Sequence, residues 1–185
     1  MTTTTTRNTQ QKHFAEVISS RNEMVIAQCY KETLQDKTFR DSIFQGAIVK
    51  ISSSDESSYT SFGLISKINN TSLDNIHKPS ALGLTAKELE HLQPQVFELL
   101  RKELEIYLFA TLEDNVLLNY PPKKPMMIHD FVKQANNEEI KLLTNDFSNI
   151  IELVKRNQLN PDILANLVSL AYKLRNNDYE YLVKI

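Results

Sequence analysis

The spacing of apolar residues changes near Tyr120, and this change constrains the fold more than any other feature of the chain. Residues 103–112 alternate with the period of two that is typical of a strand. Residues 147–154 instead follow the spacing of an amphipathic helix. The chain therefore predicts a β unit followed by a smaller α unit. In the 103–112 strand, one side holds Leu104, Ile106, Leu108, Ala110 and Leu112, and the outward side holds Glu103, Glu105, Tyr107, Phe109 and Thr111.

Five more strands are expected in the β unit. The runs FAEVIS (14–19) and MVIAQCY (24–30) flank a polar turn, and QGAIVKI (45–51) and TSFGLISKI (60–68) flank the acidic loop SSSDESS. VLLNY (116–120) follows the 103–112 strand across the turn EDN, as in a hairpin. Gly46 and Gly63 lie inside strand patterns, where glycine marks a bulge or a close backbone approach. These features predict an α+β protein with a small six-stranded β-barrel, closed or nearly closed.

Short helices interrupt this β unit, and a helical hairpin follows it. TAKELEHL begins with Thr85 and Glu88 at the spacing of a capping box, and a second short helix follows Pro94. After a short helix around NEEIKLL, two amphipathic helices are expected on either side of RNQLN, the second opening with Asn160 and Pro161. Two such helices cannot bury their apolar faces alone, so we expect them to pack on the barrel or on another chain.

The chain is therefore divided into three segments. Residues 1–12 are expected to be a flexible tail, 13–120 a barrel with inserted helices, and 121–185 a proline joint with the helical unit. The stretch YPPKKPMMIHDFV (120–132) holds Pro121, Pro122 and Pro125, which favour extended backbone and suit a joint. The alternative, a ligand for a proline-recognising groove, requires exposure, whereas MMIHDFV is apolar enough to pack down.

Composition excludes several classes of protein. A net charge of -2 gives no overall attraction to nucleic acid or to an anionic membrane, and no apolar run is long enough to span a bilayer. Three glycines leave no room for a nucleotide-binding loop, and the four histidines lack metal-ligand spacing. The single cysteine, Cys29, excludes an internal disulfide and suggests a reducing compartment. We expect a cytoplasmic protein without cofactor, metal or membrane.

Two chemical interpretations of the sequence compete with structural ones. Cys29, His129 and Asp130 invite a nucleophile-and-base arrangement, but Cys29 lies in a strand pattern where cysteine is usually an inert core residue. His129 is expected to anchor the α unit through a side-chain hydrogen bond. A nucleic-acid surface would use Lys50, Lys67, Tyr59 and Phe62, but the neighbouring acidic loop and the absence of tryptophan count against it.

Several segments together resemble the HAS-barrel family, named for the amino-terminal barrels of the HerA helicase and ATP synthase subunits. They are MVIAQCY, FQGAIVKI, the stretch from Ser61 to Thr111, and YPPKKPMMIHDFV. The motif positions are Gly46, Gly63, Pro79, Gly83, Pro94, Pro121, Pro122, Pro125 and His129.

The resemblance implies a function without chemistry. In the family's ATPases the barrel precedes the motor domain, and it holds neighbouring subunits in a ring or presents a surface to a partner. Here the residues after Leu112 are too few for a nucleotide-binding core and contain no Walker motif. We therefore expect a non-enzymatic interaction or assembly module that binds another protein or itself and has no catalytic residues. The alternatives are a nucleic-acid-binding barrel and an enzyme of unknown type.

Overall fold

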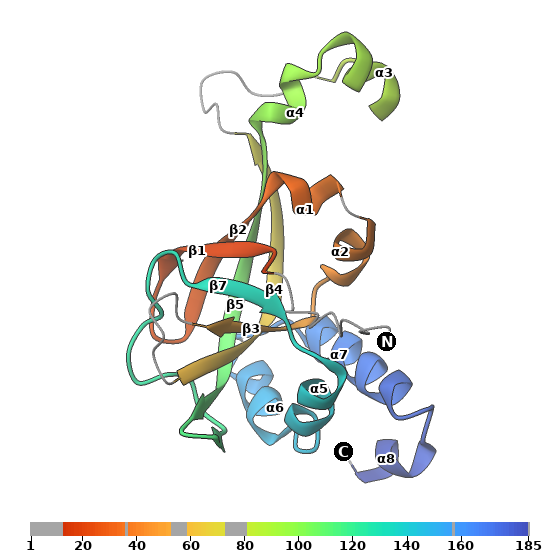
Figure 1. The fold of residues 1–185 in the computed structure, drawn as a ribbon. Helices are drawn as coiled ribbons and strands as arrows, with labels where there is room; N and C mark the ends of the chain where they lie inside the picture. Colours follow the sequence, from red (N-terminus) through yellow and green to blue (C-terminus); the bar gives the residue numbers. More distant parts are fainter. Residues whose placement is uncertain (1–12, 36, 53–58, 73–80, 157, 185) are drawn as a thin grey trace, which may run out of the picture.

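The computed structural model describes residues 13–35, 37–52, 59–72, 81–156 and 158–184. Six antiparallel strands form a closed barrel in the order β2-β1-β7-β3-β4-β5, because β2 also pairs with β5 (Figure 1). A further strand, β6, extends the sheet beyond β5. The predicted α+β barrel is confirmed. The strands are β1 (Ala15–Ser20), β2 (Met24–Cys29), β3 (Ile48–Ser52), β4 (Tyr59–Ser72), β5 (Leu100–Glu113), β6 (Val116–Leu118) and β7 (Phe131–Gln134).

The change in periodicity predicted that the sheet ends at Tyr120, and this prediction is wrong. Strand β7 follows the proline-rich segment and lies between β1 and β3, with Val132 opposite both Ala15 and Ile51. It therefore supplies the sixth strand of the barrel. The predicted hairpin across EDN is present as β5 and β6, but β6 has only three residues and lies outside the closed ring.

A bulge in β5 inverts the predicted alternation of that strand. Phe62 pairs with Ala110 and Gly63 with Leu108, which leaves Phe109 without a partner on β4. Because one extra residue shifts the side chains to the opposite face, Ala110 packs outside the barrel. The prediction that residues 104–112 keep one apolar side is therefore wrong beyond Leu108.

Two apolar clusters hold the fold together. The first fills the barrel and includes Val17, Val25, Ile51, Ile106 and Val132. The second joins the outer face of β4 and β5 to the carboxy-terminal helices, so these helices pack on the barrel rather than being left uncovered. It includes Phe62, Leu64, Tyr107, Phe109, Ile150, Ile163, Leu167 and Ala171. The helices are α5 (Asn137–Leu143), α6 (Ser148–Lys155), α7 (Pro161–Leu174) and α8 (Tyr179–Lys184).

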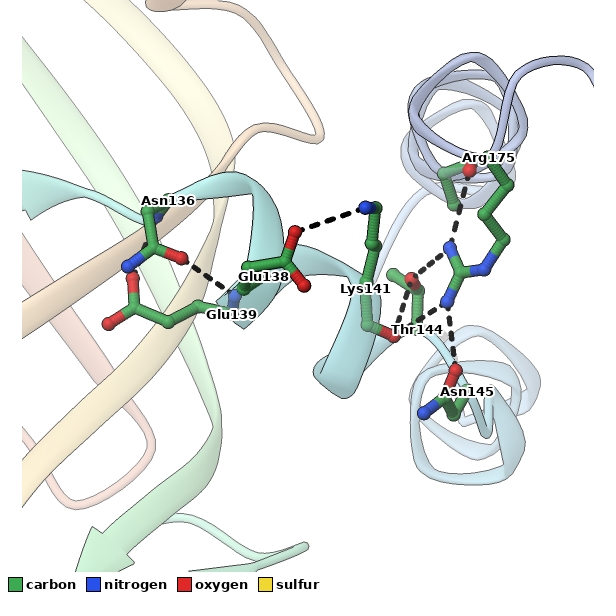
Figure 2. Close-up of polar contacts among 8 residues, drawn as sticks. Asn136, Glu138, Glu139, Lys141, Thr144, Asn145 and Arg175 are labelled. Atoms are coloured by element: carbon green, nitrogen blue, oxygen red, sulfur yellow. Dashed lines mark hydrogen bonds and ion pairs between the residues drawn. The ribbon is translucent and has the colours of Figure 1, made fainter.

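Arg175, at the carboxy-terminal end of α7, links three of these helices, and its hydrogen bonds to Lys141, Thr144 and Asn145 are drawn in Figure 2. Its guanidinium donates to Thr144 Oγ1 at 2.9 Å, to the carbonyl oxygen of Lys141 at 2.6 Å and to Asn145 Oδ1 at 2.9 Å. It also lies 4.0 Å from the ring centroid of Tyr181 on α8. The helical unit is thus fixed by one cation as well as by its apolar faces.

Strands β4 and β5 continue beyond the barrel as an arm that carries two short helices at its tip (Figure 1). These are α3 (Ala86–Leu92) and α4 (Gln95–Leu99), and the predicted capping box of Thr85 and Glu88 is present. Two further short helices, α1 (Lys31–Gln35) and α2 (Lys37–Ser42), connect β2 to β3 and had no sequence-based prediction.

Candidate functional site

The proline-rich segment after β6 forms a fixed loop on the flank of the barrel. In Figure 1 it runs on the left of the barrel, on the side away from α1, α2 and the carboxy-terminal helices. Three of its residues, Pro122, Met126 and Asp130, are buried and hold the backbone against the barrel. Met126 is 2% exposed and Asp130 is 0% exposed. We call this segment the Pro122–Asp130 loop.

Between the buried positions, the loop presents six exposed residues in two groups. The first group is Lys123, Lys124 and Pro125, and the second is Met127, Ile128 and His129. Met127 is 58% exposed and Ile128 is 48% exposed. The prediction that MMIHDFV packs down is thus correct for Met126 and Val132 and wrong for Met127 and Ile128.

A buried carboxylate fixes the turn that carries the exposed apolar pair. The backbone N–H of Met127 donates to Asp130 Oδ2 at 2.7 Å, and the N–H of Asp130 donates to the carbonyl oxygen of Met127 at 3.2 Å. His129 has a φ of 73°, in the left-handed region that non-glycine residues rarely adopt. Such a conformation persists only where the surrounding contacts impose it.

Strand β1 supplies those contacts. The N–H of His129 donates to the carbonyl oxygen of Val17 at 2.9 Å, and the N–H of Val17 donates to that of Asp130 at 3.0 Å. His129 Nδ1 lies 3.2 Å from Glu16 Oε2, and Tyr30 Oη donates to Glu16 Oε1 at 2.7 Å. His129 therefore anchors the loop to β1, not the helical unit as predicted.

These contacts also change the acidity of the groups involved. Hydrogen bonds from Tyr30 and His129 hold the pKa of Glu16 below its usual value. Burial, followed by the hydrogen bond to Glu16, raises the pKa of Tyr30. One oxygen of the Glu16 carboxylate thus contacts Tyr30 and the other contacts His129, and these contacts favour the anion.

The loop combines apolar side chains with uncompensated positive charge. Among the residues that the structure describes, neither Lys123 nor Lys124 forms an ion pair. Ile18 on β1 follows Val17 and is exposed as well. Such a surface can bind a ligand that is partly apolar and partly anionic.

The sequence-based motif positions lie in three separate places. Pro121, Pro122, Pro125 and His129 come together in or beside the loop, where Pro121 is half-buried. Gly83 and Pro94 are exposed residues of the arm tip, and Pro79 lies outside the described residues. Gly46 and Gly63 have structural roles, because a Cβ on Gly46 would clash with Asn166 of α7 and a Cβ on Gly63 would clash with Ile106 of β5.

The arrangement of Cys29, His129 and Asp130 as a catalytic group does not form. Cys29 is 4% exposed inside the barrel, and burial raises its pKa to about 12, so the reactive thiolate is absent at neutral pH. His129 instead lies on the surface beside Glu16. The prediction that Cys29 is a core residue is confirmed.

Three of the four residues proposed for a nucleic-acid surface are engaged elsewhere. Phe62 is 3% exposed beneath the carboxy-terminal helices, so it cannot stack on a base. Lys50 Nζ lies 2.7 Å from Glu139, and Lys67 Nζ lies 3.2 Å from Glu105. These side chains do not assemble the stacking platform that single-stranded nucleic acid requires.

Two other kinds of site are absent from the described residues. No group of three or more His, Cys, Asp and Glu side chains in that part of the chain could hold a metal ion. None of the helices described above is long and apolar enough to cross a membrane.

Apolar side chains are exposed on two other surfaces. The arm tip exposes Leu82, Leu84, Leu92 and Leu99, and an open groove of about 470 Å³ between α7 and α8 is lined mainly by Leu164, Val168, Tyr172 and Leu182. On the arm tip, exposed Lys87 is followed by exposed Glu88, whereas residues 122–129 contain two lysines and no Asp or Glu. The Pro122–Asp130 loop is also distinguished by the hydrogen bonds to β1 and Asp130 that fix its turn.

Comparisons with known proteins give no family assignment. No protein-family model matches the chain, and a search of curated proteins finds no match.

Proposed function

We propose that the protein is a non-enzymatic interaction module in which the barrel is a scaffold and the Pro122–Asp130 loop is the docking surface. The observation that carries this proposal is the exposure of Met127 and Ile128 side by side on a turn fixed by Asp130 and β1. Binding residues are often placed on loops held by a rigid scaffold.

The energetic case rests on burial of the apolar pair. Each side chain leaves about half of its surface in water, and burying the rest of both would contribute on the order of 2 kcal/mol. Because the turn is already fixed in the free protein, little conformational entropy is lost on binding. A fixed apolar turn is therefore a favourable anchor for a partner.

The resemblance to the HAS-barrel family supports the same proposal. That resemblance implies a six-stranded barrel that presents a surface to a partner or to a neighbouring subunit, although a barrel alone does not identify the family. No nucleotide-binding motor is included in the proposal, because the sequence has no Walker motif.

Quantitative affinity capture tests the proposal. The baits are the wild type, the double variant M127S/I128S, and L92S, which alters an exposed leucine on the arm tip. We expect the same partner, or a second copy of the chain, to be retained by the wild type and by L92S and lost by M127S/I128S. Equal retention by all three baits, with unchanged thermal unfolding, would exclude the loop as the docking surface.

A further inference from the structure

The partner's chemistry can be taken one step further, and this step rests on the proposed function. We infer that the Pro122–Asp130 loop binds a segment of a partner protein that carries carboxylates beside apolar side chains. The inference comes from the charges that are accessible on the loop and from their position relative to Met127 and Ile128.

The accessible charge of the loop is positive. Lys123 and Lys124 are exposed, and residues 122–129 contain no Asp or Glu. Asp130 is fully buried and accepts from Met127, and the Glu16 anion lies beside His129, where it accepts from Tyr30. The whole chain has a net charge of -2, so this positive surface is a local feature.

The cationic and apolar groups can contact a single ligand segment. They emerge on either side of Met126, whose side chain is buried and holds the backbone between them. The prolines at 122 and 125 restrict the backbone around the lysines. An extended segment that places an apolar residue against Met127 and Ile128 would therefore place its neighbours near the lysines.

Charge on this surface would select the partner more than it strengthens binding. An exposed ion pair typically changes an equilibrium constant by about 1.5-fold to 5-fold. Complementary charge also raises the rate of encounter and disfavours partners of the wrong sign. We expect modest affinity from the apolar pair and discrimination from the lysines.

An anionic membrane offers similar chemistry but fits less well. Stable membrane attachment usually requires two signals, because even a single acyl chain gives only marginal binding. Two lysines and two half-exposed side chains provide less than that. We therefore commit to a protein segment and treat membrane binding as an outcome of the test.

The test uses random peptides displayed on phage and selected on the full-length immobilised protein. The proteins compared are the wild type, M127S/I128S, K123E/K124E, and the control K155E/K173E, which reverses two exposed lysines on α6 and α7. Selected peptides are then synthesised, and their affinities are measured by fluorescence anisotropy at low and high salt. Vesicles of phosphatidylcholine with about 30% phosphatidylserine are tested by co-sedimentation.

The expected result is enrichment of acidic peptides that also contain apolar residues. Their affinity should fall about tenfold in K123E/K124E and at high salt, and should be unchanged in K155E/K173E. Selection on K123E/K124E should instead enrich basic peptides.

The contradicting outcomes separate the two proposals. Peptides that depend on Met127 and Ile128 but show no acidic bias and no salt effect would overturn the inference and leave the proposed function standing. Peptides that bind M127S/I128S as well as the wild type would overturn both. Vesicle binding lost in both loop variants would overturn the inference in favour of a lipid surface.

Discussion

Asn166 on α7 donates a hydrogen bond from Nδ2 to the carbonyl oxygen of Gln45, 2.9 Å away and 121 positions earlier in the sequence. The bond lies beside Gly46, whose N–H donates to the carbonyl oxygen of Ile65 at 2.9 Å. A Cβ on Gly46 would lie 2.9 Å from Asn166 Cβ. The turn before β3 therefore packs directly against α7.

Replacing Gly46 with Ala should destabilise the protein by about 2–4 kcal/mol, because the new Cβ meets α7 and the φ of 95° is unfavourable for alanine. Urea denaturation measures this change. Gly83→Ala is the matched control, since its φ is also positive but nothing lies within 4 Å of the added Cβ. Gly83→Ala should lower the free energy of unfolding by only about 1 kcal/mol. Equal losses for the two variants would contradict the close contact between Gly46 and α7.

Arg175→Ala should lower the free energy of unfolding by about 2–3 kcal/mol, because four hydrogen-bond acceptors and the face of the Tyr181 ring lose their shared cation. Thermal unfolding followed by circular dichroism gives the change. The comparison is Arg156→Ala, which removes only an exposed ion pair with Glu152 and should cost less than about 0.5 kcal/mol. Similar losses for the two variants would contradict the role assigned to Arg175.

Asp130→Asn should release the turn that presents Met127. Asparagine is close in shape but has one carbonyl oxygen, so the hydrogen bond from the Met127 N–H becomes weaker or is lost, at a cost of about 1–3 kcal/mol. Amide hydrogen exchange at Met127 should accelerate. In the control Asp162→Asn, which alters an exposed carboxylate on α7, exchange at Met127 should not change. Unchanged exchange in the Asp130 variant would mean that the backbone alone fixes the turn.

Glu16 makes stability depend on acidic pH. Its pKa is lower in the folded state than in the unfolded state, so its contribution is present above the unfolded pKa and is lost as pH falls through the folded pKa. Glu16→Gln should therefore flatten the acidic limb of the stability curve below about pH 5. The control is Glu138→Gln, whose side chain is 82% exposed. If the stability of the Glu16 variant falls as steeply with decreasing pH as that of the wild type, Glu16 does not cause the acidic loss of stability.

Local signals in the sequence predicted much of the fold. The Thr85 capping box, the start of α7 at Asn160 and Pro161, and the alternation in β5 up to Leu108 each depend on residues within a few positions of one another. Such local patterns can be recognised without the fold.

The features that were missed depend on distant contacts. Strand β7 has four residues, of which only Val132 is fully buried, so no alternation reveals it. The bulge at Phe109 is visible only from its pairing with β4. Met127 and Ile128 look like core residues, and their exposure follows from a turn held by Val17 and by Glu16, which is 113 positions from His129.

The most direct test of the docking surface is hydrogen–deuterium exchange of the protein with and without the partner captured by the wild type. Residues 122–130 should become protected on binding, with little change at the arm tip or along α7 and α8. Protection confined to the arm tip or to the groove between α7 and α8, with exchange in the loop unchanged, would contradict the proposal.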